Sequence, residues 1–398
     1  MRKLCLTVVG LYIGLLGAFS QTLNDSSVYK KKTLTLDEVN FVTSYYHQEG
    51  DHSPVTGGIG TEKLSDFATT IELKLNKYDK KNLKHELALE LGVDHYTSAS
   101  SDKIDPRTIS SASSNDTRIY PSAAYTVTNE KTGKSFGANA SYSNEYDYQS
   151  YGAGISFAKT SIDKNREFSV RLQAYLDNVS LILPVELRTG LTGRGKGGYP
   201  LAPRNSYSTS MVFSQAVNKR LEIAFLLDLI YQSGYLGTPF HRIYFSNGSE
   251  SNEHLPSSRF KIPIALRANF FASDKLIIRT FYRYYKDDWG LSAHTLSLDL
   301  PVKLTSFFSV SPFYRYYTQS AVNYYAPYKA HKVSEQFYTT DDDLSPFSSN
   351  TVGIGFRMAQ PGGVFSIKHL NALELRFAHY DRNDGLNSNI LTLSLKMK

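Results

Sequence analysis

Apolar and polar residues alternate with a period of two along most of the chain. Ile71, Leu73 and Leu75 alternate with polar residues, and the same pattern returns at 221–229 and at 391–397. Successive side chains of a β-strand point to opposite faces, so this alternation is typical of strands with one apolar face. Helical periodicity is scarce. The pattern therefore predicts an all-β fold.

The connections between these segments alternate in length. Tight polar turns, such as 76–82 and 217–220, are followed by longer stretches, such as 49–63 and 237–258. Short turns at one end and long loops at the other are typical of an outer-membrane barrel. We therefore expect a transmembrane antiparallel up-and-down β-barrel with short periplasmic turns and long extracellular loops. Sixteen strands are predicted, at 38–47, 64–76, 83–96, 117–128, 135–145, 149–161, 168–182, 207–217, 221–235, 259–272, 276–286, 291–304, 307–322, 350–359, 371–381 and 388–398.

The first twenty residues have the pattern of a secretion signal. Arg2 and Lys3 precede an apolar run, and Ala18 and Ser20 are the small residues expected before a cut at Gln21. We expect residues 1–20 to be a Sec-type signal peptide, 21–37 a short periplasmic segment, and 38–398 a single barrel domain. The expected location is the outer membrane of a Gram-negative bacterium, in contact with its lipid bilayer.

Composition removes several functional classes. The 398 residues hold one Cys, so a disulfide framework and a Cys-ligated metal centre are excluded. The net charge of +7 comes from dispersed residues, and no nucleic-acid partner is expected. The sequence contains no His-x-x-x-His pair and no Gly-x-Ser-x-Gly elbow, so we expect no metal, no cofactor and no enzymatic activity. Asp341–Asp343 lacks the spacing of a calcium loop, which predicts a solvated acidic loop.

Charged residues gather on the strand faces opposite the aliphatic ones. If the aliphatic face meets lipid, the lumen has an acidic wall from the first nine strands, made of Glu72, Glu86, Glu90, Asp94, Asp177, Glu222 and Asp228. The last seven strands add a basic wall, made of Lys261, Arg267, Arg279, Arg283, Lys303, Arg315, Arg357 and Arg376. The exceptions are Lys74 and Arg171 on the acidic wall and Asp299 and Glu374 on the basic wall. Burial of an unpaired charge is costly, so either the lumen is hydrated, as in a pore, or salt bridges between the two walls close it.

Two segments carry a family resemblance. One is EVNFVTSYYHQE at 38–49 running into SPVTGGIGTE at 53–62, and the other is VDHYTSASSDKID at 93–105 followed by ISSASSND at 109–116. Together they resemble the DUF3570 family, exported proteins of unknown function that are frequent in Bacteroidetes. The resemblance implies an outer-membrane barrel. It also implies a redox assembly at the envelope, because members of the family occur beside genes for thioredoxin-like and flavin-transferase proteins. It supplies no functional residues.

Three functions remain open from the sequence. The first is a porin-like channel for small polar or charged solutes, or a scaffold of an envelope assembly. The second is a plugged, non-conducting barrel that binds a lipoprotein or a periplasmic redox partner. The third is a barrel enzyme acting on lipid. The Ser- and Asp-rich segment at 97–116 is expected to fold into the barrel mouth as a constriction, with a cation site as the alternative.

Overall fold

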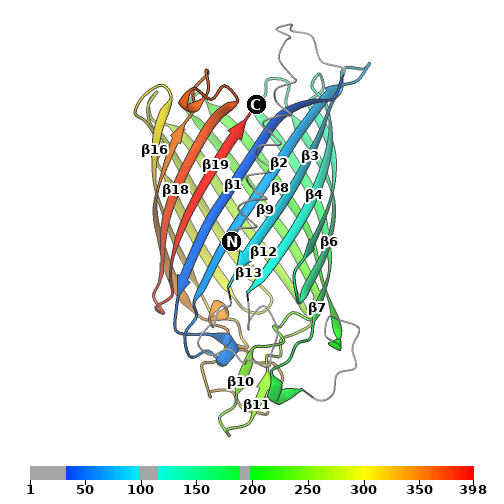
Figure 1. Cartoon of the computed structure of the whole chain (residues 1–398), viewed down its shortest axis with the longest axis vertical. Coiled ribbons are helices and arrows are strands. Elements are labelled where there is room, and N and C mark those ends of the chain that lie inside the picture. Colours follow the sequence, from blue (N-terminus) through cyan, green and yellow to red (C-terminus); the bar gives the residue numbers. More distant parts are fainter. Residues whose placement is uncertain (1–32, 98–114, 189–197) are drawn as a thin grey trace.

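The structure, a computed structural model, describes residues 33–97, 115–188 and 198–398. These residues form one closed antiparallel barrel with tilted strands (Figure 1). The predicted signal peptide, most of the predicted N-terminal segment and most of the Ser- and Asp-rich segment lie outside the described residues. The wall strands are β1 (Thr35–Glu49), β2 (Leu64–Tyr78), β3 (Lys84–Tyr96), β4 (Asp116–Asn129), β5 (Lys134–Asn144), β6 (Tyr148–Thr160), β7 (Arg166–Ser180), β8 (Leu201–Asn218), β9 (Leu221–Gly234), β12 (Ser258–Phe271), β13 (Ile277–Asp287), β14 (Ser292–Asp299), β15 (Val302–Lys303), β16 (Phe308–Gln319), β17 (Phe347–Met358), β18 (Leu370–Arg382) and β19 (Asn387–Met397).

The barrel has sixteen wall strands, as the sequence predicts. The sheet contains 17 named strands, but β14 and β15 both pair with β16 and are two segments of one wall strand. Pro301 separates them, and proline has no backbone N–H to continue the ladder. The largest error in a predicted boundary is at β8, which begins at Leu201 because its first residues continue the ladder with β7, where Leu201 lies opposite Ser180.

The sheet closes between the first and last strands. Val39 on β1 lies opposite Leu73 of β2 on one side and opposite Met397 of β19 on the other. Every other wall strand pairs with the wall strands before and after it in the chain, and β9 pairs with β12. Closure satisfies the backbone groups within the sheet and leaves no open edge, which a strand surrounded by lipid requires.

The two ends of the barrel differ in how the strands are connected. At one end, which we call the turn end, short turns such as 79–83 and 219–220 join the strands, and the C-terminus lies here (Figure 1). At the other end, the loop end, the connections include the hairpin of β10 (Arg242–Tyr244) with β11 (Glu250–Asn252). Among the described residues, four short 3-10 helices lie in connections: η1 (Pro54–Thr56), η2 (Val185–Leu187) and η4 (Asp342–Leu344) at the loop end, and η5 (Val364–Ser366) at the turn end.

The outward face of the wall is apolar and exposed. Phe136, Ile155 and Val352 are each more than half exposed, and all three have outward register positions. Such a surface is stable in contact with lipid rather than water. Among the described residues, none of the helices has the length and apolar character needed to cross a bilayer.

The loops at the loop end pack into a folded cap, which we define as residues 50–63, 235–257 and 320–346. Arg242 donates to the Val55 carbonyl at 2.9 Å, pairs with Glu186 at 2.5 Å, and accepts a hydrogen bond from Thr340 at its own carbonyl. Arg242 thereby joins three loops to η2 through its side chain and its backbone carbonyl. A small apolar cluster around Trp289, which is 3 % exposed, packs under the cap.

Candidate solute site in the barrel lumen

The ladder registers place the fifteen predicted lumen residues on one face of the wall. Residues directly opposite each other in a ladder point to the same face. Glu72 lies opposite Glu90, Asp94 opposite Arg118, and Arg283 opposite Thr295. The registers of the other strand pairs place the remaining predicted residues on this same inward face, which is the reverse of the face that carries the exposed aliphatic residues. They are Glu86, Asp177, Glu222, Asp228, Lys261, Arg267, Arg279, Lys303, Arg315, Arg357 and Arg376.

The ion pairs of the inner face run sideways along the wall. Lys74 pairs with Glu72 on its own strand and with Glu38 on the neighbouring strand, each at 3.2 Å. Arg279 reaches Asp299 on the next strand at 3.6 Å. Among the described residues of the wall, every ion pair joins one strand or two adjacent strands. Pairing along the wall neutralises charge without bridging the lumen.

The acidic wall contains more cations than Lys74 and Arg171, the two exceptions recognised in the sequence. Asp94 has Arg118 at 4.0 Å, and Glu86 has Lys84 at 2.9 Å. Together with Lys74, these cations lie on β2, β3 and β4 and point inward with the carboxylates. The sequence-based division into two walls of opposite sign therefore applies less to the first strands than to β12–β18.

A cavity of about 1060 Å³ lies in the lumen next to the cap. Three of the predicted basic residues line it, Arg283 from β13, Arg315 from β16 and Arg376 from β18. Arg267 and Arg357 have the same inward orientation but do not line this cavity. The structure thus brings together only part of the predicted basic wall.

Arg283, Arg315 and Arg376 make no ion pair with a carboxylate among the described residues. The Nε of Arg283 is buried and has no hydrogen-bond partner there. Arg376 stacks on Phe313, with its guanidinium carbon 3.9 Å from the ring centroid. That ring lies directly over Gly353, where a Cβ would come 2.2 Å from the ring, so only glycine permits this packing.

The carboxylates that line the cavity are either ion-paired with an arginine or protonated. Asp299 pairs with Arg279, and Asp343 pairs with Arg382. Glu62, which belongs to the cap, is mostly buried, and its burial together with the charges of Asp343 and Asp341 raises its pKa to about 8. Glu62 is therefore largely protonated at neutral pH. The unpaired charge of the cavity is positive.

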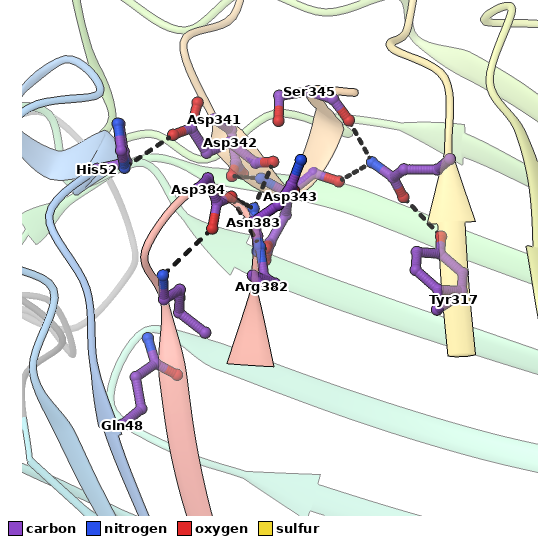
Figure 2. A network of polar contacts seen from close by, with 12 residues as sticks. Gln48, His52, Tyr317, Asp341, Asp342, Asp343, Ser345, Arg382, Asn383 and Asp384 are labelled. Atoms are coloured by element: carbon purple, nitrogen blue, oxygen red, sulfur yellow. Dashed lines mark hydrogen bonds and ion pairs between the residues drawn. The ribbon is translucent and has the colours of Figure 1, made fainter. Parts of the chain in front are cut away.

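Arg382 lines the cavity and also contacts the cap segment 341–343. Figure 2 shows these contacts. The side chain of Arg382 is 4 % exposed, and it binds Asp384 at 2.5 Å, Asp343 at 2.6 Å and the Asp342 carbonyl at 2.9 Å. Asp342 is itself buried and accepts a hydrogen bond from Tyr325. The prediction of a solvated acidic loop at 341–343 is correct for Asp343, whose side chain is 75 % exposed, and wrong for Asp342, which is buried.

Sequence reasoning missed Arg382 and Glu62. A signal existed for Arg382, because it has the same strand parity as Arg376 and falls at the end of the same alternating segment. No comparable signal existed for Glu62, which lies in an irregular loop and enters the cavity only because the β1–β2 connection folds over the mouth.

Three solved structures resemble this chain, and their similarity to it is low. A mutant of the ferric enterobactin receptor PfeA from Pseudomonas aeruginosa is 12 % identical, with a TM-score of 0.45 over 86 % of this chain and 53 % of the receptor. The chain thus spans about half the receptor's length. The outer membrane protein OpdK from Pseudomonas aeruginosa is 8 % identical, with a TM-score of 0.41 over 92 % and 99 %. A bacterial polysaccharide outer membrane secretin is 11 % identical, with a TM-score of 0.44 over 90 % and 98 %. Similarity this low does not distinguish a receptor from a channel.

The sequence profile described as "Protein of unknown function (DUF3570)" matches residues 92–390. No curated protein matches the chain. The profile covers the wall from the end of β3 through β18 and the cap segments 235–257 and 320–346. Because the match spans well over half of the 398 residues, the chain belongs to the DUF3570 family of proteins of unknown function.

Proposed function

We propose that this protein is an outer-membrane channel for small anionic solutes, with the arginine-lined cavity as its selectivity site. The loop end would face the cell exterior and the turn end the periplasm, the orientation usual for bacterial barrels. The closed sheet and its exposed apolar outer face support the membrane location.

The observation that carries the proposal is the convergence of Arg283, Arg315 and Arg376 on one lumen cavity without carboxylate partners among the described residues. A guanidinium group presents a fixed fork of donors that matches a carboxylate or phosphate. Unpaired cations in a partly closed lumen are costly unless water or an anion solvates them. A passing anion supplies that solvation, and a cation does not.

The sideways ion pairs support a hydrated passage rather than a lumen closed by salt bridges. The ion pair of His52 with Asp342, at 3.5 Å, and that of Arg242 with Glu186 join loops across the mouth, and both belong to the loop end. Below the cap, the described wall residues pair only with their neighbours. A solute would therefore meet the cap first and then the basic cavity.

The test compares two double variants that remove the same charge. Arg283→Gln with Arg315→Gln removes cavity arginines, whereas Arg267→Gln with Arg357→Gln removes inward arginines outside the cavity. In planar bilayers under a KCl gradient, we expect the first pair to shift the reversal potential toward cations more strongly than the second. An equal shift in both would place selectivity elsewhere, and unchanged selectivity in the first would overturn the proposal.

A plugged barrel that binds a partner is the second candidate, and the folded cap favours it. Arg242 and the Trp289 cluster hold the cap over the mouth as a packed unit. Such a barrel would bind an envelope lipoprotein or a periplasmic redox partner and would conduct no current. The conductance measurement separates the two candidates. Neither gives the barrel a catalytic role.

A further inference from the structure

His241, Glu253 and Asp341 converge inside the cap, far apart in sequence. One nitrogen or oxygen atom from each lies within 4.8 Å of the other two. His241 and Glu253 flank the β10–β11 hairpin in the β9–β12 connection, and Asp341 belongs to the β16–β17 connection. The cluster therefore sits where two cap loops meet.

His241 points an unsatisfied atom into this cluster. The residue is 8 % exposed, and its Nδ1 is buried without a hydrogen-bond partner among the described residues. Nδ1 lies 3.8 Å from Glu253 Oε1 and 3.8 Å from Asp341 Oδ2. Both distances are too long for hydrogen bonds, and buried polar atoms are rarely left unpaired.

Glu253 is held rigidly in place. It is 2 % exposed, and it accepts hydrogen bonds from the Thr238 backbone N–H at 2.6 Å and the Thr339 hydroxyl at 2.5 Å. Each of its oxygens keeps a further lone pair. These partners fix the carboxylate as outer-shell hydrogen bonds fix a metal ligand.

Asp341 offers one free oxygen from the opposite loop. It is the N-cap of η4, where Oδ1 accepts the backbone N–H of Asp343 at 3.0 Å, and Oδ2 is the atom that faces His241. The Asp341 backbone N–H donates to the same Thr339 hydroxyl that binds Glu253. The two carboxylates are therefore positioned through a shared residue.

We propose that His241, Glu253 and Asp341 bind a divalent transition-metal ion, such as Zn²⁺, that clamps the two cap loops together. One imidazole nitrogen and two carboxylate oxygens are ligands that zinc accepts, with a water completing four-coordination. Tetrahedral zinc holds neighbouring ligand atoms about 3.4 Å apart, so the two 3.8 Å separations from His241 need a contraction of about 0.4 Å. The two carboxylate oxygens, which lie within 4.8 Å of each other, must also move together, by up to about 1.4 Å. An imidazole ligand disfavours Ca²⁺ and Mg²⁺, which prefer oxygen.

Zinc binding by the tag-free, folded barrel tests the proposal. The protein is stripped with EDTA, transferred to metal-free detergent buffer and titrated with Zn²⁺ against a chromophoric chelator. We expect one Zn²⁺ per chain. His241→Gln and Asp341→Asn should each weaken the affinity by about tenfold or more. Asn keeps the N-cap acceptor of η4, so this variant removes the charged ligand while preserving the local fold.

Two matched variants control for loss of charge or histidine in the same loops. His254→Gln changes an exposed histidine of the β9–β12 connection, and Glu335→Gln changes a carboxylate of the β16–β17 connection that pairs with His331. Both should bind Zn²⁺ as the wild type does. With Co²⁺ as probe, the wild type should show the visible absorption of a four-coordinate site, and Asp341→Asn should lose it. Absence of stoichiometric binding, or binding that survives both ligand variants, would overturn the proposal and leave a metal-free cluster of imidazolium and carboxylates.

Discussion

Arg382 Nη1 lies 2.6 Å from Asp343 Oδ1, and this contact ties the end of β18 to the β16–β17 connection (Figure 2). Asp384, in the β18–β19 turn, holds the other side of the same guanidinium group through Nε and Nη2. The ring of Phe347 lies 3.8 Å from the guanidinium carbon. A buried arginine with partners from two connections fixes the position of the cap relative to the wall.

Arg382→Gln should loosen the cap. The substitution leaves Asp384, a partly buried carboxylate, without its charged partner, at a cost of about 1–3 kcal/mol. We expect faster protease cleavage within 320–346 and a lower unfolding midpoint, while the sheet content stays unchanged. Arg357→Gln, an inward arginine far from the cap, is the control. Equal cleavage of both variants would show that Arg382 does not anchor the cap.

Glu62→Gln should remove a pH dependence of stability. The pKa of Glu62 is raised from an ordinary value near 4.5 to about 8 in the folded protein. Between these values the folded chain keeps a proton that the unfolded chain has released, so stability falls as the pH rises. Urea unfolding in EDTA should show that the free energy of unfolding falls more between pH 5 and pH 9 for the wild type than for the variant. The same loss in both would mean that Glu62 does not stay protonated.

Ionisation of Glu62 should also change selectivity. Above pH 8, a negative charge joins the cavity lining beside the three arginines, so anion preference should decrease. Reversal potentials of the wild type measured at pH 6 and pH 9 should differ, and those of Glu62→Gln should differ less. This outcome depends on conduction, whereas the unfolding result does not.

Leu89 and Glu90 test the assignment of the two faces at one point of the wall. They are neighbours near the middle of β3, with Leu89 outward and Glu90 inward. Leu89→Arg should destabilise the barrel in lipid by about 2–4 kcal/mol, because it places a charge against the hydrocarbon. Glu90→Arg should cost much less, because the charge remains in the lumen. Unfolding from liposomes measures both, and the reverse order would contradict the assignment.

Alternation alone predicted the strands and the inward residues, because a strand buries and exposes side chains with a fixed period. Glu86, Glu90 and Asp94 differ by even numbers and so share a face. The positions of Lys84 and Arg118 beside those carboxylates depend on ladder register, which alternation does not specify. Register therefore decides which charges of the wall are already paired.

The cap could not be predicted from the sequence, because it is built by contacts between distant loops. His241, Glu253 and Asp341 have no spacing typical of a metal site, and they meet only after the barrel brings their strands around the mouth. The acidic run at 341–343 is predicted to be solvated, but folding turns it onto Arg382 and His241. Short irregular segments carry no periodicity that would indicate such contacts.

Single-channel recording of the wild-type protein in planar bilayers tests the central claim most directly. With the folded state checked by the mobility difference between unboiled and boiled samples, a KCl gradient should give discrete current steps and a reversal potential on the anion-selective side. That result would follow from unpaired Arg283, Arg315 and Arg376 in a hydrated lumen. A folded barrel that inserts but passes no current, or one that prefers cations, would contradict the account.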